Sequence, residues 1–347
     1  IALACRTVSL SSYPWVVTGD EGMFAMAARS ALRGDLRNPF ASATGGYPSF
    51  LFVTQARVMS IAGDNIAGAR TQSAVLGTLA VLAVYALTRH HFGRSAALIA
   101  ATLMATNNFV IFWSRAAQNQ IAPMLFFPLA LLFLDRGLVD RSRTDSLMAG
   151  LAIGLAQYFH PGNRLLVPIA AAYLGYAVLS PLPRSRGALS AAVRSLILPA
   201  MIVVGAALIS FAPLFGYFWS RPDEYWNRIN QVSAFSSGWF DRELESTGFS
   251  TAHLLWIQLR NAAMLPFSTY PDGLFKPGVP FVGWPMAVPV AIGLGLVTAT
   301  FWRRNSFGFV VGFWPTVVGL ALTEGPVATN RYVAAGPFLA IFGALGI

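Results

Sequence analysis

Apolar stretches of about 17 to 25 residues recur along the whole chain, and this is the length that a helix needs to cross a lipid bilayer. Of the 347 residues, 55% are hydrophobic and only 11% are charged. A soluble domain usually carries about a quarter charged residues. The sequence therefore predicts an all-α polytopic membrane protein whose solvent is mostly lipid.

The apolar stretches define the expected membrane spans. They are 66–88, 95–113, 121–135, 146–159, 165–180, 196–219, 281–301, 306–322 and 332–347. A short apolar stub at residues 1–5 reads as the tail of a further helix, which gives about ten transmembrane helices. The chain opens without a methionine and ends inside an apolar run, so we expect a single integral membrane domain, 1–347, truncated at one or both ends.

Arginine residues alternate between the short loops that connect these spans. The basic loops contain Arg89 and Arg94; Arg136, Arg141 and Arg143; Arg184, Arg186 and Arg194; and Arg303 and Arg304. The positive-inside rule places these loops in the cytoplasm and the other set outside. The predicted outer set is 11–65, 114–120, 160–164, 220–280 and 323–331. Because the net charge of +10 is spread between apolar runs and forms no single patch, no nucleic-acid partner is expected.

Two outer segments are too long to be simple connections. In the first, 11–65, Thr18 or Asp20 can cap a helix that stops at Gly34, and Pro48 can begin a second helix. The first helix has an apolar face opposite its arginines, which is typical of a helix on a membrane surface. The second long segment is rich in aromatic residues that suit the headgroup level. No soluble domain is predicted.

Acidic residues are scarce, and two of them stand together on the predicted outer face. Asp20 and Glu21 lie at the start of the first surface helix. A carboxylate held near an acceptor hydroxyl can act as a general base, and a helix N-terminus favours a negative charge there. Asp20 can equally be only the cap of that helix, since acids are common at helix starts. The sequence leaves both interpretations open.

Polar residues also collect where the other outer loops meet the apolar runs. They include Ser114, Arg115, Asn119, Gln120, Tyr158, His160, Arg164, Glu324, Asn330 and Arg331, and Arg70 stands just inside the outer end of a span. Guanidinium groups bind phosphate through paired hydrogen bonds. Each arginine can instead extend to lipid headgroups, but four on the same side as the acidic pair favour a site. His160 alone is expected to be a structural or hydrogen-bonding residue.

Motifs for several other chemistries are missing from the sequence. It contains no HExxH, no Cys/His cluster, no P-loop and no GxGxxG, and its single cysteine, Cys5, excludes an internal disulfide. Metal-dependent hydrolysis, nucleotide-driven transport and dinucleotide chemistry therefore lack support. Whether a divalent metal is required stays open, although two adjacent acids without partners make a tight metal site unexpected.

An ordered set of short motifs resembles a known family. The set is Asp20-Glu21-Gly22-Met23-Phe24-Ala25 with Ala28-Arg29 and Gly34-Asp35; Tyr47-Pro48-Ser49-Phe50; Ala69-Arg70; Ser114-Arg115 with Asn119; Tyr158 with Arg164; Arg221-Pro222-Asp223-Glu224 with Arg228; and Asn330-Arg331-Tyr332. It resembles the dolichyl-phosphate-mannose protein mannosyltransferase and aminoarabinose transferase superfamily, the GT-C fold glycosyltransferases of family 39 and their relatives. The resemblance is strongest over about 18–180.

The resemblance implies a GT-C-like bundle with amphipathic helices in the first outer loop. It further implies inverting transfer of a sugar from a polyprenyl-phosphate donor, at a site that faces outward from a bacterial inner membrane. Asp20 would be the base and Glu21 its support. The implied substrate-binding set is Arg70, Arg115, Arg164 and Arg331 for the donor phosphate, with Tyr47, Tyr158 and His160.

One departure and two rival functions stay open. Gly46-Tyr47-Pro48 replaces the Lys-Pro-Pro or His-Pro-Pro triplet of the family, which leaves the donor undetermined. The acceptor can be a protein, a lipid or a glycan, and no cofactor beyond the donor lipid is firmly implied. A transporter or flippase would place charges near the middle of spans, whereas here they cluster at the ends. A non-catalytic subunit of a larger membrane complex would keep the fold without needing Asp20.

Overall fold

The computed structural model describes residues 1–179, 186–268, 280, 282–325 and 329–347. Within these residues every regular element is helical, which confirms the predicted all-α class. The predicted basic loop at Arg184 and residues 269–279 of the second long outer segment lie outside the described residues.

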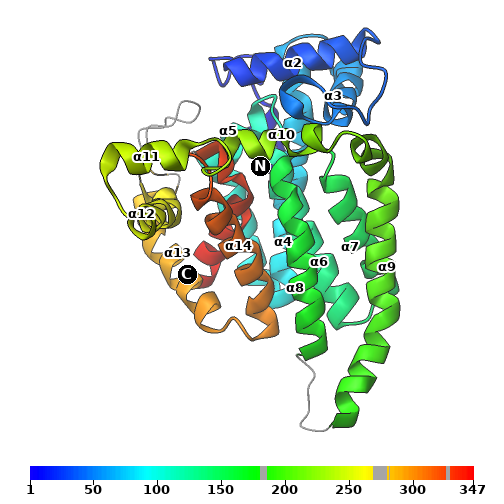
Figure 1. The fold of residues 1–347 in the computed structure, drawn as a ribbon, viewed down its shortest axis with the longest axis vertical. Helices are drawn as coiled ribbons and strands as arrows, with labels where there is room; N and C mark the ends of the chain where they lie inside the picture. The colour runs from blue at the N-terminus through cyan, green and yellow to red at the C-terminus, as the bar shows by residue number, and fades with distance from the viewer. Residues whose placement is uncertain (180–185, 269–279, 281, 326–328) are drawn as a thin grey trace.

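The long apolar helices form the bundle drawn in the lower part of Figure 1. They are α4 (Ile66–Thr106), α6 (Ile121–Leu134), α7 (Arg143–Ala156), α8 (Leu166–Leu179), α9 (Arg186–Trp219), α13 (Trp284–Ala299), α14 (Arg304–Ala321) and α15 (Gly336–Gly346). Four helical segments are long and apolar enough to cross a membrane, and α13 and α14 form a pair bent by 112°. The chain is an integral membrane protein.

One pair of predicted spans is joined in the structure. Helix α4 covers the span 66–88, the expected loop after it, and most of the next span, which ends in α5 (Asn108–Arg115). Gly93, with φ 84° and ψ −178°, interrupts the helical backbone within α4. Glycine reaches this conformation without steric cost, so the chain changes direction without a separate loop.

The predicted outer segments fold as helices at one end of the bundle. They are α2 (Gly19–Leu32), α3 (Ser49–Ala62), α10 (Pro222–Val232), α11 (Trp239–Thr247) and α12 (Thr251–Met264). Helices α2 and α3 lie across the upper end of the bundle in Figure 1, with α10 and α11 just below. The short elements are α1 (Ala2–Thr7), η1 (Thr44–Gly46), the π-helical η2 (Asp135–Val139), η3 (Pro161–Leu165), η4 (Leu265–Phe267), η5 (Thr329–Arg331) and η6 (Val333–Ala335).

Helix α2 packs its apolar face against α3. The Phe24 ring centroid lies 5.1 Å from that of Tyr47 and 5.2 Å from that of Phe52, and all three side chains are buried. Aromatic pairs at such distances add about 0.5–1.5 kcal/mol beyond the area that they bury. The apolar stripe expected to face lipid is therefore largely used to fix the first outer segment as a compact layer.

Candidate functional site

A cavity of about 430 Å³ lies at the end of the bundle that carries α10. This volume is in the range of sites for small ligands, about 300–1,000 Å³. The cavity is lined by residues from the turn that precedes α3, from α6, η3, α10 and α14, and from the segment that contains η5 and η6. Its polar lining includes Tyr47, Gln120, His160, Arg164, Arg228, Ser233, Thr316, Thr323, Asn330 and Arg331. Four residues of the predicted substrate-binding set, Tyr47, His160, Arg164 and Arg331, therefore come together here.

Arg164 is held by α10 with part of its guanidinium left unused. Its Cζ lies 3.6 Å from the centroid of the Tyr225 ring, and its Nη2 donates to the Tyr225 carbonyl oxygen at 2.8 Å. Its Nη1 is buried and has no hydrogen-bond acceptor among the described residues. A buried donor without a partner costs about 1–3 kcal/mol, and more when charged. This unsatisfied donor in the cavity wall is suited to an anionic ligand.

Two further arginines line the same cavity. Arg331 donates to the Glu324 carbonyl oxygen at 2.9 Å and forms an ion pair with its carboxylate at 3.4 Å. Arg228 lies 5.8 Å from the Tyr47 ring centroid and donates to Gln231 at 3.4 Å. Across the described part of the chain, neither Arg164 nor Arg228 forms an ion pair with a carboxylate. The cavity is therefore electropositive.

Tyr47 connects these cations to the acidic end of α2. Burial raises the pKa of its hydroxyl, Arg228 and Arg331 oppose this rise, and Asp20 adds to it. Asp20 is thus close enough to act electrostatically on a residue of the cavity wall, although it does not itself line the cavity. Asp20 and the two arginines therefore act in opposite directions on the same hydroxyl group.

His160 lies in the cavity wall as a neutral imidazole. Burial lowers its pKa to about 3, and the Arg228 and Arg164 guanidinium groups add to this effect. Its Nδ1 accepts a hydrogen bond from the Gly162 backbone N–H at 3.0 Å, which caps η3. The neutral ring therefore carries its proton on Nε2, where it can act as a donor. His160 was expected to be a structural or hydrogen-bonding residue, and this hydrogen bond agrees with that expectation. The structure also places the ring in the wall of the cavity.

The two predicted catalytic acids, Asp20 and Glu21, are adjacent at the N-terminus of α2 but differ in exposure. The cap is Thr18, whose Oγ1 accepts from the Glu21 backbone N–H at 3.1 Å. Asp20 is exposed and does not cap the helix, so the interpretation of Asp20 as a cap is wrong. The competing interpretation of Asp20 as a base stays a prediction.

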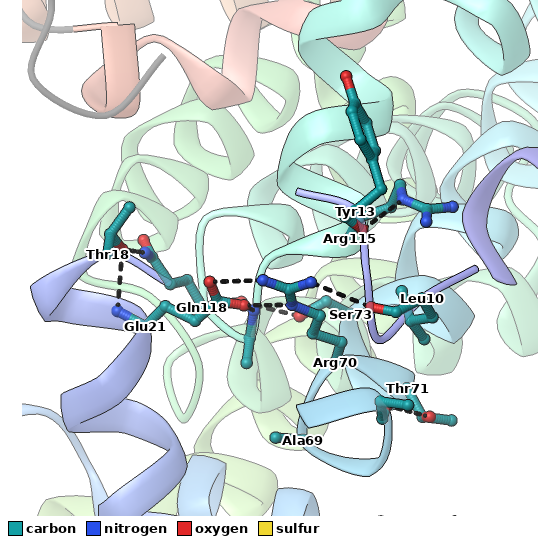
Figure 2. Close-up of polar contacts among 12 residues, drawn as sticks. Leu10, Tyr13, Thr18, Glu21, Ala69, Arg70, Thr71, Ser73, Arg115 and Gln118 are labelled. Atoms are coloured by element: carbon teal, nitrogen blue, oxygen red, sulfur yellow. Dashed lines mark hydrogen bonds and ion pairs between the residues drawn. The ribbon is translucent and has the colours of Figure 1, made fainter. Parts of the chain in front are cut away.

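Glu21 points inward and binds Arg70, as Figure 2 shows. Arg70 Nε and Nη2 donate to the two carboxylate oxygens at 2.7 and 3.0 Å, and Arg70 Nη1 donates to the Leu10 carbonyl oxygen at 3.0 Å. Glu21 also accepts from the Ala117 backbone N–H at 2.9 Å. Both side chains are almost fully buried and neither lines the cavity. Their contacts favour a structural role that ties α2 to α4.

Arg115 and Tyr158 are also placed away from the cavity. Arg115 donates to four backbone carbonyl oxygens of the N-terminal segment, those of Cys5, Val8, Ser9 and Tyr13. The Tyr158 hydroxyl donates to the Ser210 carbonyl oxygen at 2.9 Å, and its ring packs against Phe50. Both residues hold segments together, and the substrate contacts predicted for them stay predictions.

The sequence analysis did not select Arg228 or Gln120 as site residues, yet both line the cavity. Gln120 is 5% exposed, and its Oε1 has no hydrogen-bond partner in the described residues. Arg228 lies on α10, within the predicted outer segment 220–280. Its distance in sequence from the other arginines hid it, because only the packing of α10 beside η1 and η3 brings it to them.

Part of the chain is similar in sequence to a known protein family. Residues 47–215 match the sequence profile of a family described as dolichyl-phosphate-mannose-protein mannosyltransferase. A search of curated protein sequences gave no match.

Solved structures share the fold over nearly the whole chain. The crystal structure of ArnT from Cupriavidus metallidurans bound to undecaprenyl phosphate matches with a TM-score of 0.69 and 16% identity, covering 99% of this chain and 58% of that one. The archaeal oligosaccharyltransferase AglB from Archaeoglobus fulgidus, in complex with an inhibitory peptide and a dolichol-phosphate, matches with a TM-score of 0.55 and 17% identity, covering 99% and 48%. This chain thus spans about half the length of these proteins.

The profile match rests on sequence and the structural matches rest on fold, and the two agree. The chain is a membrane protein with the fold of ArnT and AglB, and its residues 47–215 are similar in sequence to the dolichyl-phosphate-mannose-protein mannosyltransferases.

Proposed function

We propose that the protein transfers a sugar from a polyprenyl-phosphate donor to an acceptor on the outer face of the membrane. The observation that carries the proposal is the electropositive cavity lined by Arg164, Arg228 and Arg331. A phosphate that leaves with the electrons of the glycosidic bond gains negative charge, and preorganised guanidinium groups stabilise that charge best.

In the proposed reaction, Asp20 takes the proton of the acceptor hydroxyl. The acceptor oxygen then forms a bond to the anomeric carbon while the bond from that carbon to the phosphate oxygen breaks. The phosphate leaves with the electron pair, and Arg164 Nη1, which has no acceptor in the described residues, is placed to receive it. A single displacement of this kind inverts the anomeric carbon.

Two further observations support this assignment. Undecaprenyl phosphate and dolichol-phosphate are the ligands of two proteins with the same fold. The cavity is also open in the described part of the chain, whereas a non-catalytic subunit would need neither an open cavity nor an exposed Asp20. Glu21 and Arg70 contribute by fixing the helix that carries Asp20.

Donor binding and transfer can be tested separately. Native mass spectrometry of the purified chain in detergent should show bound polyprenyl phosphate, and Arg164→Gln should lose this adduct. Arg260→Gln, which removes an exposed arginine on α12, is the matched control and should keep it. Equal binding in Arg164→Gln and in the control would contradict the proposed phosphate site.

Transfer is measured as movement of labelled sugar from polyprenyl phosphate to native membrane acceptors. Removal of a general base typically costs about 10²–10⁴ in rate. We therefore expect Asp20→Asn to bind donor normally and to transfer sugar at least about 100-fold more slowly. Wild-type turnover in Asp20→Asn would overturn the assignment of the base, while leaving the phosphate site to the binding experiment.

A further inference from the structure

A second cluster of chemically active side chains lies far from the cavity. Helix α14 begins at Arg304 and first reaches the cavity with Thr316, so about 18 Å of helix separates the two places. Near Arg304, His90 and His91 of α4 meet Asp135 at the start of η2. The connection between α13 and α14 lies at the lower end of Figure 1, away from α2, α3 and α10.

We propose that His90, His91 and Asp135 form a zinc site at this end of the bundle. One ligand atom from each residue lies within 4.8 Å of the others. His90 Nε2 already lies 2.8 Å from Asp135 Oδ2. Two ligand atoms that share a tetrahedral zinc ion at bond lengths near 2.0 Å are separated by roughly 3.3 Å. Small side-chain rotations would bring the three atoms to that spacing.

His91 supplies the independent observation that points to a ligand. Its side chain is buried, with 8% exposed, and its Nε2 forms no hydrogen bond of normal geometry among the described residues, although the Asn305 side chain lies beside the ring. A buried nitrogen with an unused lone pair or proton beside a carboxylate and a second imidazole is unusual in a folded protein. Binding to a metal ion would satisfy it without any change in backbone.

The ligand types select the metal. Two imidazole nitrogens and one carboxylate suit zinc and the neighbouring transition metals, whereas magnesium and calcium prefer oxygen ligands. Three protein ligands would leave a fourth position for water or for Asp140. The π-helical turn η2 places Asp135 toward the histidines, and Asp135 is fully buried.

In this structure the Arg304 guanidinium binds the Asp135 carboxylate that would bind the zinc ion. Its Nη2 lies 2.6 Å from both Asp135 Oδ2 and Asp140 Oδ1. Its side chain is 37% exposed, so it can turn outward when a metal ion takes the carboxylate. Zinc would then replace the contact between α14 and η2 and would add His91 to the existing contact between α4 and η2. The guanidinium and the metal ion compete for the same oxygen atom.

The test uses the full chain purified in detergent through a tag without histidines and stripped with a chelator. Zinc binding is measured by competition with a chromogenic chelator. We expect one zinc ion per chain at micromolar zinc, with binding weakened at least about tenfold in His91→Gln and in His90→Gln. His253→Gln changes an exposed histidine of α12. This variant is the matched control and should bind zinc as the wild type does.

Arg304→Gln distinguishes a zinc site from an ion-pair network. Removing the competing guanidinium should strengthen zinc binding, whereas a network with no metal function would only lose stability. If His91→Gln fails to fold, His90→Gln decides the question, because a quarter of the His90 side chain is exposed and tolerates change. Absence of zinc binding by the wild type, or equal binding by wild type and both histidine variants, would overturn the proposal.

Discussion

Glu21 and Arg70 form a buried ion pair that joins the first outer segment to the longest helix of the bundle. Each Glu21 oxygen accepts one guanidinium hydrogen bond, and the two residues are separated by 49 positions in the chain. Asp20, the neighbour of Glu21 in the first turn of α2, is exposed. The ion pair therefore fixes the position of a proposed catalytic residue without touching the cavity.

Breaking this pair should destabilise the protein strongly. Glu21→Gln leaves the Arg70 guanidinium buried without a counter-charge, a change that typically costs about 3–5 kcal/mol. The matched control is Asp64→Asn, which breaks the Arg29–Asp64 pair, whose side chains are 40% and 52% exposed. Exposed pairs contribute about 0–1 kcal/mol. Thermal unfolding in detergent compares the two variants, and equal shifts would contradict a structural role for Glu21.

The two residues at the start of α2 should separate stability from activity. Thr18→Ala removes the oxygen that accepts the Glu21 N–H, and loss of such a cap costs about 0.5–2 kcal/mol. Asp20→Asn removes no hydrogen bond between described residues, so its melting temperature should stay closer to that of the wild type. The same pair of variants is then assayed for sugar transfer. A larger loss of stability in Asp20→Asn than in Thr18→Ala would show that Asp20 holds the helix.

Acid should destabilise the protein partly through His160. Its pKa is lowered to about 3 in the folded state, against about 6.5 in an unfolded chain. Between these values the unfolded state binds more protons, so stability is complete above pH 6.5 and falls as the pH falls toward 3. At pH 5 the loss from this residue is up to about 2 kcal/mol.

His160→Asn removes this titration and keeps an oxygen that can cap η3. We expect unfolding measured at pH 7 and at pH 5 to differ less in this variant than in the wild type. His253→Asn, at an exposed position of α12, should keep the wild-type difference. An unchanged difference in His160→Asn would show that His160 titrates normally.

Two glycines of α13 should respond in opposite ways to alanine. A Cβ at Gly293 would lie 2.0 Å from the Phe342 carbonyl oxygen of α15, whereas a Cβ at Gly295 meets nothing within 4 Å. Gly293→Ala should therefore push α13 from α15 and cost about 1–3 kcal/mol. Gly295→Ala should be neutral or stabilising by up to about 1 kcal/mol, since alanine favours a helix. Thermal unfolding of both variants checks the prediction, and a loss in Gly295→Ala alone would contradict this packing.

Much of the fold could be predicted because a chain that crosses a lipid bilayer must satisfy its backbone hydrogen bonds internally, as a helix does. Span length predicted most of the apolar helices and their order, and Thr18 was one of two expected caps. The break in α4 at Gly93 falls in the loop expected between the spans 66–88 and 95–113, but the sequence did not show that a single glycine would make this turn. The sidedness expected from the arginines stays a prediction.

The site was predicted less completely, because arginine has the same chemistry in a cavity and in a buried structural contact. Of the four arginines expected to bind phosphate, Arg164 and Arg331 line the cavity. Arg70 is satisfied by Glu21, and Arg115 by backbone carbonyl oxygens. Each of these partners comes from a segment far away in the sequence, so local patterns held no sign of them.

Composition and span length by themselves determined that this chain is a helical membrane protein, and ordered motifs indicated the family that part of it resembles. Only the tertiary structure decided which of the two adjacent acids, Asp20 and Glu21, is buried and which is exposed. Successive residues of a helix point about 100° apart, so one of two neighbours can face solvent while the other is buried. Which of them turns inward depends on where α4 presents Arg70, and here it is Glu21 that is buried while Asp20 stays exposed.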